Sequence, residues 1–275
     1  MTHVISIQSQ VVHGHVGNSA AVFPMQAAGL DVAAVPTVLL SNHPHYPTVR
    51  GRTMPADLVA DLLCGVEERG LVDHAAVVVT GYLGSVETGL VVADFIARAK
   101  ARNHRMTHVC DPVIGDDDLG VFVEAGLIAV FRDVLVPMAD VITPNRYELS
   151  LLSGCEIHVA AAVTDAANLL RARGIGAVVA TGCRLDDTPQ GTVETLTCTA
   201  DSASRCGVPL LPIRPCGTGD LFTALLVTRL IAGDNAHAAA AGATRAVFAV
   251  LERTCAAGSS EMRIVGHTFE PRLGD

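Results

Sequence analysis

A short run near the carboxyl end of the chain combines the residue types that phosphate chemistry needs. In Arg214-Pro-Cys-Gly-Thr-Gly-Asp-Leu-Phe-Thr223, two glycines bracket a threonine and an aspartate follows. Glycine lets the backbone turn tightly and approach a ligand closely. The apolar segment after it predicts a buried helix, whose first turn points free N–H groups and the positive end of its dipole at one place. Gly217, Thr218 and Gly219 are therefore a candidate anion hole.

Asp220 is unexpected at such a loop, because a carboxylate repels a phosphate unless it has a chemical task. A general base next to a transferring phosphoryl group is such a task. The alternative is an ordinary glycine-rich turn in which the aspartate caps the N-terminus of the following helix. On these four residues alone, that alternative is the better interpretation.

Composition restricts the class of protein. The chain has 275 residues, 50% of them hydrophobic and 17% charged, with a mean hydropathy of +0.41. This Val- and Ala-rich composition is typical of α/β sheets that are covered on both faces. The net charge of −9 and the lack of a basic stripe argue against a nucleic-acid partner. The apolar runs are too short for a membrane span, and the first residues do not resemble a signal peptide, so a cytoplasmic protein is expected.

Apolar strands and amphipathic helices alternate along the chain. Strands are expected at Val4–Ile7, Val32–Leu40, Ala76–Thr80, Thr107–Cys110, Val141–Thr143, Ala177–Thr181, in a hairpin within Gly191–Ile213, and at Met262–Val265. Helices are expected at Asn18–Leu30, Pro55–Arg69, Val86–Arg102, Ala160–Arg173, Leu221–Ala232 and Ala236–Leu251. The alternation predicts a mostly parallel sheet with helices on both faces. Without a linker or repeat, one domain over residues 1–275 is the simplest account.

Right-handed crossovers bring the loops after the parallel strands to one edge of the sheet, where ligands bind in this class of fold. Three acidic residues, Asp111, Asp116 and Glu148, lie in these loops. Their oxygen atoms suit Mg²⁺, which usually keeps several waters. For Asp111 and Glu148, capping the next helix is a serious alternative. For Asp117 and Asp118, a solvated turn is preferred.

Other loops at the same edge carry polar and aromatic groups that suit a flat heteroaromatic substrate. Ser9 follows the first strand, Ser41-Asn-His43 the second and Thr80-Gly-Tyr82 the third. The polar segment 41–52, with Pro44 and Pro47, is a candidate flap.

Several familiar sites are excluded or disfavoured. The sequence has no G-x-x-x-x-G-K-[ST] loop and no G-x-S-x-G turn, and the glycines at 14 and 17 do not form a dinucleotide-binding fingerprint. Its eight cysteines lack zinc-site spacing, and reduced core cysteines are expected. Cys216 adjoins the glycine loop, but simple packing is favoured. None of the eleven histidines has metal-site spacing with another, so most are expected at the surface.

Seven motifs share an order and spacing that resemble pyridoxal kinase, in the vitamin-B6 branch of the ribokinase-like superfamily. They are Ser6-Ile-Gln-Ser-Gln-Val-Val, Gly14-x-x-Gly-Asn-x-Ala-Ala, Ser41-Asn-His, Thr80-Gly-Tyr, Cys110-Asp-Pro-Val-x-Gly-Asp, Ile142-Thr-Pro-Asn-x-x-Glu and Gly217-Thr-Gly-Asp. The resemblance covers nearly the whole chain. It implies a three-layer α/β/α sandwich and transfer of phosphate from ATP to the 5′-hydroxymethyl group of pyridoxal, pyridoxine or pyridoxamine.

The resemblance also implies roles for individual residues. Asp220 matches the catalytic base, and residues 217–219 match the anion hole. Positions matching substrate contacts are Ser9, Tyr82 and Pro44. Positions matching the nucleotide phosphates and the metal are Asp111, Thr143, Asn145, Glu148 and Thr181, with Asp111, Asp116 and Glu148 around Mg²⁺. A monovalent cation such as K⁺ and a homodimer are implied as well.

The chain departs from the family in three places. Pro44 stands where a threonine is common, so a hydroxyl contact to the substrate is absent. Gly120-Val121 replaces a Gly-Cys that traps the pyridoxal aldehyde in some members, and Ser204–Pro215 is short and matches poorly. Rival interpretations are a hydroxymethylpyrimidine or sugar kinase of the same fold, and a non-catalytic protein that binds pyridoxal phosphate.

Overall fold

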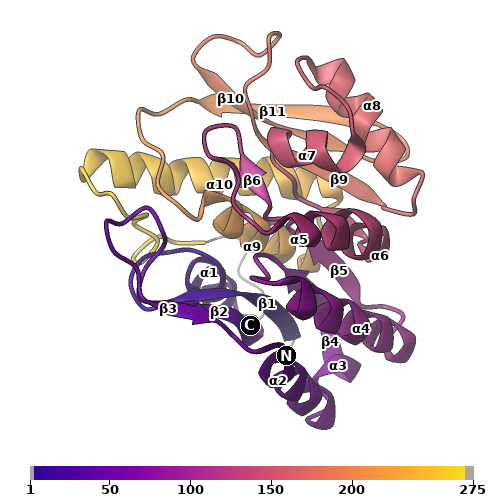
Figure 1. The fold of residues 1–275 in the computed structure, drawn as a ribbon. Helices are drawn as coiled ribbons and strands as arrows, with labels where there is room; N and C mark the ends of the chain where they lie inside the picture. The colour runs from indigo at the N-terminus through magenta and orange to yellow at the C-terminus, as the bar shows by residue number, and fades with distance from the viewer. Residues whose placement is uncertain (1–2, 270–275) are drawn as a thin grey trace.

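A nine-stranded sheet lies between two layers of helices in the computed structural model, which describes residues 3–269 (Figure 1). The strands follow the order β11-β10-β9-β8-β5-β4-β1-β2-β3. Their bounds are β1 His3–Val11, β2 Asp31–Leu40, β3 Gly51–Thr53, β4 Ala75–Thr80, β5 Thr107–Cys110, β8 Val141–Ile142, β9 Ala177–Cys183, β10 Thr192–Cys198 and β11 Ala203–Pro209. The strands from β9 to β2 are parallel, and β3, β10 and β11 pair antiparallel at the edges. The predicted α/β fold is thus confirmed.

The helices divide between the two faces of the sheet. The full set is α1 Asn18–Ala27, α2 Ala56–Glu68, α3 Leu71–His74, α4 Val86–Arg102, α5 Ala125–Val130, the π-helical turn η1 Phe131–Leu135, α6 Val136–Met138, α7 Arg146–Ser153, α8 Ala160–Arg171, α9 Thr218–Ile231 and α10 Ala236–Ala256. Helices α1, α9 and α10 cover one face and share a core cluster, and α2 to α8 contribute to the core of the other face. A short hairpin, β6 Gly115–Asp116 and β7 Gly120–Val121, stands apart from the main sheet.

Alternation along the strands explains why both faces are apolar. In β4, Val77 and Val79 belong to the core under α9 and α10, whereas Val78 belongs to the opposite core. Successive side chains of a strand point to opposite faces, so a strand buried on both sides reads as an unbroken apolar run. This is why the run at 75–79 was recognisable in the sequence.

The predicted boundary of α4 is confirmed at both ends. The helix spans Val86–Arg102, and the side chain of Ser85 accepts a hydrogen bond from the N–H of Thr88 at 3.1 Å. The predicted strand at Met262–Val265 is wrong, because these described residues run without strand pairing. Met262 and Ile264 are each 1% exposed and pack in the core under α9 and α10. Their apolar alternation reflects burial against helices. In a run this short, the same alternation is expected for a strand, so the sequence does not distinguish the two.

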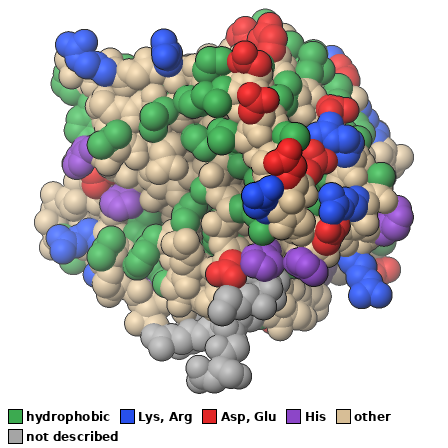
Figure 2. Space-filling model, turned by 90° about the horizontal axis from the view of Figure 1, so that it is seen from below, with side chains coloured by type: hydrophobic (Ala, Val, Ile, Leu, Met, Phe, Trp, Pro, Cys, Tyr) green, Lys and Arg blue, Asp and Glu red, His purple; other side chains and the backbone are tan. Residues whose placement is uncertain are grey.

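Charges are mixed on the described surface. The face seen in Figure 2 intersperses Lys and Arg with Asp and Glu rather than gathering the basic side chains into one stripe. None of the described helices combines the length and the apolar character needed to cross a membrane.

Candidate functional site

The glycine loop lies at the carboxyl edge of the parallel strands, against the segment that follows β1. Gly217 is the N-cap of α9 and has a φ of +83°. A Cβ atom at this position would lie 1.7 Å from the carbonyl oxygen of His15. Only glycine fits this conformation and this close approach. Gly217 has no side chain that could cap α9, so the N–H groups of Thr218 and Gly219 remain available to an anion.

Asp220 lies in the first turn of α9 and is half-buried. Burial raises the pKa of Asp220 above its ordinary value, while the N–H groups of Gly17 and of Asp220 itself oppose that rise. Gly17 in turn packs against the end of β1, since a Cβ on Gly17 would lie 2.4 Å from Ser9 Oγ. The fold therefore brings Ser9, from β1, and Asp220, from α9, close to the same residue, Gly17.

Asp111 approaches the same helix from the end of β5. Its side chain is buried, and Thr223 Oγ1 donates to its Oδ2 at 3.3 Å. Thr223 also lies 2.9 Å from the hydroxyl of Thr143, which follows β8. Burial, followed by the charges of Glu148 and Asp220, raises the pKa of Asp111 well above its ordinary value. Thr223 was not predicted as a site residue, although it lies one helical turn after Asp220.

Glu148 and Asn145 cap helix α7, as the alternative interpretation of Glu148 proposed. Asn145 accepts from the N–H of Glu148 at 2.9 Å, and Glu148 Oε2 accepts from the N–H of Asn145 at 2.8 Å. Glu148 Oε1 also accepts from Ile114 at 2.9 Å and Gly115 at 3.4 Å. Burial raises the pKa of Glu148 to about 8, against these three backbone donors. Helix α7 itself was missed in the sequence.

Thr181 belongs to the same corner of the edge. It forms an isolated parallel bridge with Asn145, and its N–H donates to the carbonyl of Pro144 at 2.9 Å. The side chain of Asn145 donates to the carbonyl of Gly115 at 2.7 Å. Asn145 therefore joins the strand end that carries Thr181 to the hairpin that carries Asp116.

Asp116 is half-buried in β6 and accepts from the N–H groups of Asp118 at 3.0 Å and Leu119 at 2.7 Å. Its second oxygen lies 3.5 Å from Arg214, three residues before Gly217. Asp118 also pairs with Arg214, and Asp117 pairs with Arg146. The acidic turn thus forms ion pairs with Arg214, which precedes the glycine loop, and with Arg146. Asp117 and Asp118 are therefore paired with arginines, whereas a solvated turn was expected for them.

The oxygen atoms gathered here fit a hard divalent cation. Asp111 is buried, and its pKa is raised in part by Glu148 and Asp220, so a cation among these carboxylates would relieve their repulsion. Oxygen ligands are those that Mg²⁺ prefers. Glu148 already accepts three backbone hydrogen bonds, and this favours contact with a metal through water rather than directly.

The expected substrate side is formed by the end of β1 and by the loops after β2 and β4. Ser9 lies within β1 rather than after it, because this strand continues to Val11. Tyr82 is half-buried, and burial raises its pKa, with a smaller effect from Glu124. The N–H of Gly81 donates to the carbonyl of Ile7 at 3.1 Å, which ties this loop to β1. Pro44 is exposed on the segment after β2.

Segment 41–50 is folded onto the glycine loop and onto the chain after α10. His43 Nε2 lies 2.9 Å from Glu261 Oε1, and Tyr46 Oη donates to the same oxygen at 2.8 Å. His45 Nδ1 lies 3.0 Å from Cys216 Sγ. Glu261 is 218 residues from His43, and no sequence signal marked it. His43 and His108 are buried and are thus exceptions to the expectation that most histidines lie at the surface.

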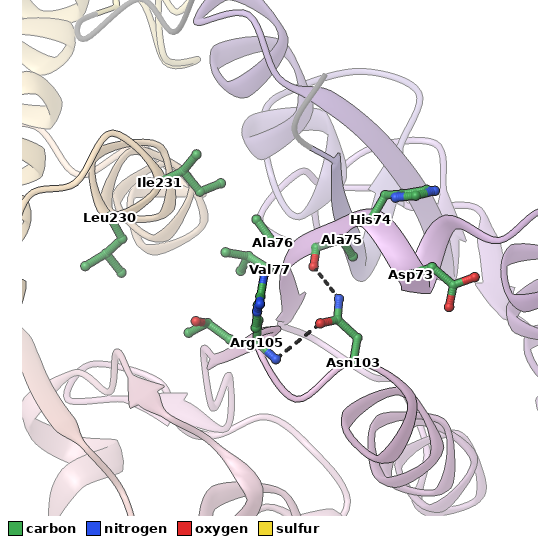
Figure 3. A pocket seen from close by; sticks show the side chains of 10 residues that line it. Asp73, His74, Ala75, Ala76, Val77, Asn103, Arg105, Leu230 and Ile231 are labelled. Carbon is green, nitrogen blue, oxygen red and sulfur yellow. Dashed lines mark hydrogen bonds between the residues drawn. The ribbon is translucent and has the colours of Figure 1, made fainter.

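A separate hollow of about 390 Å³ lies at the opposite edge of the sheet. It is lined by the amino ends of β4 and β5 and by Leu230 and Ile231, near the end of α9 (Figure 3). It contains none of the predicted site residues, and ligands in this class of fold bind at the carboxyl edge.

A parallel sheet with a glycine-capped helix N-terminus and buried carboxylates at its carboxyl edge agrees with the ribokinase-like α/β kinases among solved structures, and the chain is of this class. The sequence matches the phosphomethylpyrimidine kinase family over residues 34–264. A pyridoxal kinase PdxY of Rubrobacter xylanophilus is 39% identical over 264 residues, which cover 96% of this chain and 91% of the relative. A pyridoxine/pyridoxal/pyridoxamine kinase of Bordetella avium is 40% identical over 259 residues, covering 94% and 88%.

Solved structures agree with these relatives. Pyridoxal kinase from Leishmania donovani in complex with ADP and pyridoxamine superposes with a TM-score of 0.89 at 32% identity, covering 98% of this chain and 95% of that one. The chain therefore belongs to the phosphomethylpyrimidine kinase family, in the pyridoxal kinase branch that these relatives represent.

Proposed function

We propose that this protein transfers the γ-phosphoryl group of ATP to the 5′-hydroxymethyl group of pyridoxal, and of related B6 vitamers, in a single kinase domain. The observation that carries the proposal is the position of Asp220. It lies at the free N-terminus of α9, next to the Ser9–Gly17 contact on one side and close to Asp111 on the other. A base between a substrate pocket and a phosphate site is what this transfer requires.

Asp220 accepts the proton of the substrate hydroxyl as the hydroxyl oxygen attacks the γ-phosphorus; the bond from that phosphorus to the β–γ bridging oxygen breaks, and ADP leaves. Its carboxylate must be ionised to do so, and the N–H groups of Gly17 and Asp220 favour the ionised form. The N–H groups at the start of α9 stabilise the charge on the transferring group, and losing one such donor typically costs about 3 kcal/mol of transition-state stabilisation. Catalysis of this reaction is mainly positioning and charge stabilisation.

Ser9 and Tyr82 line the pyridine pocket in this proposal, and segment 41–52, with Pro44, closes over it as a flap. Closure excludes water and so suppresses hydrolysis of ATP. Thr143, Asn145 and Thr181 lie near the nucleotide phosphates. Asp111, Asp116 and Glu148 would hold Mg²⁺, which would neutralise phosphate charge. The proposal also includes a monovalent cation such as K⁺, a homodimer and a cytoplasmic location.

The test is ATP-dependent formation of pyridoxal 5′-phosphate by the wild type and by Asp220→Asn. We expect turnover to fall by about 10²–10⁴-fold, because a positioned general base contributes this much, while pyridoxal binding is retained. Asp234→Asn is the matched control, since Asp234 pairs with Arg229 at 2.8 Å near the other end of α9 and should keep its activity.

Each other outcome points to a different conclusion. Equal turnover in wild type and Asp220→Asn removes Asp220 from the mechanism. Pyridoxal binding without turnover in the wild type favours a non-catalytic binding protein. Phosphorylation of hydroxymethylpyrimidine, but not of pyridoxal, assigns the chain to that substrate instead.

A further inference from the structure

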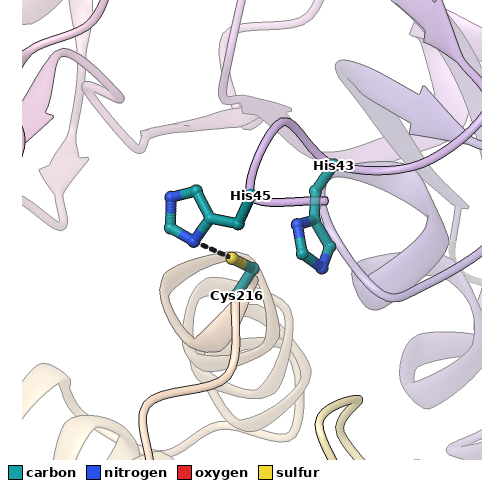
Figure 4. A group of neighbouring side chains, drawn as sticks. All are labelled: His43, His45 and Cys216. Carbon is teal, nitrogen blue, oxygen red and sulfur yellow. Dashed lines mark hydrogen bonds between the residues drawn. The ribbon is translucent and has the colours of Figure 1, made fainter. Parts of the chain in front are cut away.

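Three side chains that commonly bind transition metals meet where segment 41–50 touches the glycine loop (Figure 4). They are His43, His45 and Cys216, and one ligand atom from each lies within 4.8 Å of the other two. His45 Nδ1 and Cys216 Sγ are only 3.0 Å apart. Pro44 separates the two histidines, and Cys216 lies 171 residues after His45, so only the folded chain assembles this group.

His43 is held for coordination and lacks a second partner. It is 8% exposed, and its Nε2 lies 2.9 Å from Glu261 Oε1. Its Nδ1 is buried without a hydrogen-bond partner among the described residues. With the Nε2 hydrogen donated to Glu261, Nδ1 carries a lone pair. A buried lone pair without a partner is unfavourable, and a metal ion would satisfy it.

The carboxylate behind His43 completes an arrangement that is common at metal sites. A histidine that binds a metal usually donates its other N–H to a carboxylate, which fixes the ring and strengthens the ligand. Glu261 serves this purpose, and Tyr46 Oη holds it at 2.8 Å. Burial opposes its ionisation, but hydrogen bonds from Tyr46 and His43 outweigh that effect and lower the pKa of Glu261.

We propose that His43 Nδ1, His45 and Cys216 bind one Zn²⁺ ion, with water as the fourth ligand. Two imidazoles and a thiolate suit Zn²⁺ and not Mg²⁺, which takes oxygen ligands. Bond lengths of about 2.0–2.3 Å in a tetrahedral site require donors roughly 3.3–3.7 Å apart. Ligand atoms that lie up to 4.8 Å apart would approach by about 1–1.5 Å, whereas His45 Nδ1 and Cys216 Sγ, now 3.0 Å apart, would separate by about 0.5 Å. The thiol proton leaves to solvent as the Zn–S bond forms.

Zinc at this position would tie segment 41–50 to the residue before Gly217. The histidines lie on the segment that follows β2, and Cys216 precedes the N-cap of α9. The metal would therefore hold the two sides of this contact closed. This consequence concerns mobility and is measurable without any assay of phosphoryl transfer.

The binding test is a Zn²⁺ titration of the reduced wild type in competition with a chromophoric chelator. We expect one tight site. Cys216→Ser and His45→Gln should each lower the Zn²⁺ affinity. Loss of a residue that only supports a ligand typically costs about 10–100-fold in affinity, so loss of a ligand itself should cost at least this much. Cys64→Ser is the control, because Cys64 is an exposed cysteine of α2 outside the cluster and should leave affinity unchanged.

Cobalt substitution identifies the ligand directly. With Co²⁺, the wild type and Cys64→Ser should show a thiolate-to-metal charge-transfer absorption, and Cys216→Ser should lack it. Thermal unfolding in the presence of a chelator shows whether each variant is folded. If Cys216→Ser does not fold, His45→Gln still tests the site, because His45 is exposed and its replacement should not disturb the core.

Trypsin measures the mobility of the segment through the exposed Arg50 and Arg52. Zn²⁺ should slow cleavage there in the wild type and in Cys64→Ser, but not in Cys216→Ser. The proposal is overturned if the folded wild type binds no Zn²⁺, if Cys216→Ser binds it as tightly as the wild type, or if the Co²⁺ complex lacks the thiolate absorption.

Discussion

Gly217 offers the sharpest test of how the glycine loop works. In Gly217→Ala, the new Cβ would lie 1.7 Å from the carbonyl oxygen of His15. An ordinary carbon–oxygen contact is about 3.3 Å, so the loop and the segment at 14–17 must separate by about 1.6 Å. The φ of +83° adds roughly 1–2 kcal/mol for any residue with a Cβ.

This displacement moves the catalytic groups as well as the backbone. The N–H groups at the start of α9 shift from the phosphate, and Gly17 shifts from Asp220. Since a misplacement of about 1 Å can cost 10²-fold in rate, we expect kcat for pyridoxal phosphorylation to fall by at least about 100-fold.

Gly233→Ala separates the two effects. Gly233 follows α9 with a φ of +98°, but nothing lies within 4 Å of an added Cβ. It should lose only about 1–2 kcal/mol of unfolding free energy in urea and keep its kcat. Gly217→Ala should lose more stability than Gly233→Ala, together with its turnover. If Gly217→Ala retains wild-type kcat and the same stability as Gly233→Ala, the close packing of the loop against His15 is not what positions the anion hole.

Three further variants test the surroundings of the site. Thr223→Val removes a donor from buried Asp111 and should lower the unfolding free energy in urea by about 1–3 kcal/mol; an unchanged value would show that this hydrogen bond contributes nothing net. The pKa of Glu148 is raised from an ordinary 4.5 to about 8, so the folded state binds the extra proton and the contribution of Glu148 to stability falls as pH rises between these values. Glu148→Gln should remove that part of the pH dependence in metal-free protein, and an identical pH profile would contradict the shift. Arg205→Met leaves the buried carboxylate of Glu194 without its ion pair and should destabilise the β10–β11 hairpin by about 1–3 kcal/mol, seen as faster hydrogen exchange there.

Each departure from expectation has a physical cause of its own. The predicted strand at 262–265 was wrong because burial against α9 and α10 produces the same short apolar alternation as strand pairing. Helix α7 was missed because its eight residues are few for a periodicity argument, although Asn145 and Glu148 already had capping-box spacing. Burial of His43 depends on a glutamate 218 residues away, which no local pattern could indicate.

Local sequence patterns were enough to indicate most of the secondary structure and the chemistry at the carboxyl edge of the sheet. Apolar runs defined most of the strands, and the glycine loop with Asp220 indicated a phosphate site, because these are local properties of neighbouring residues. Which residues touch one another became clear only from the folded chain: Ser9 contacts Gly17, Asp111 contacts Thr223, and segment 41–50 contacts Cys216 and Glu261. Those contacts arise from the packing of distant segments, and the glycine loop acquires its role because β1, β5 and α9 converge on it.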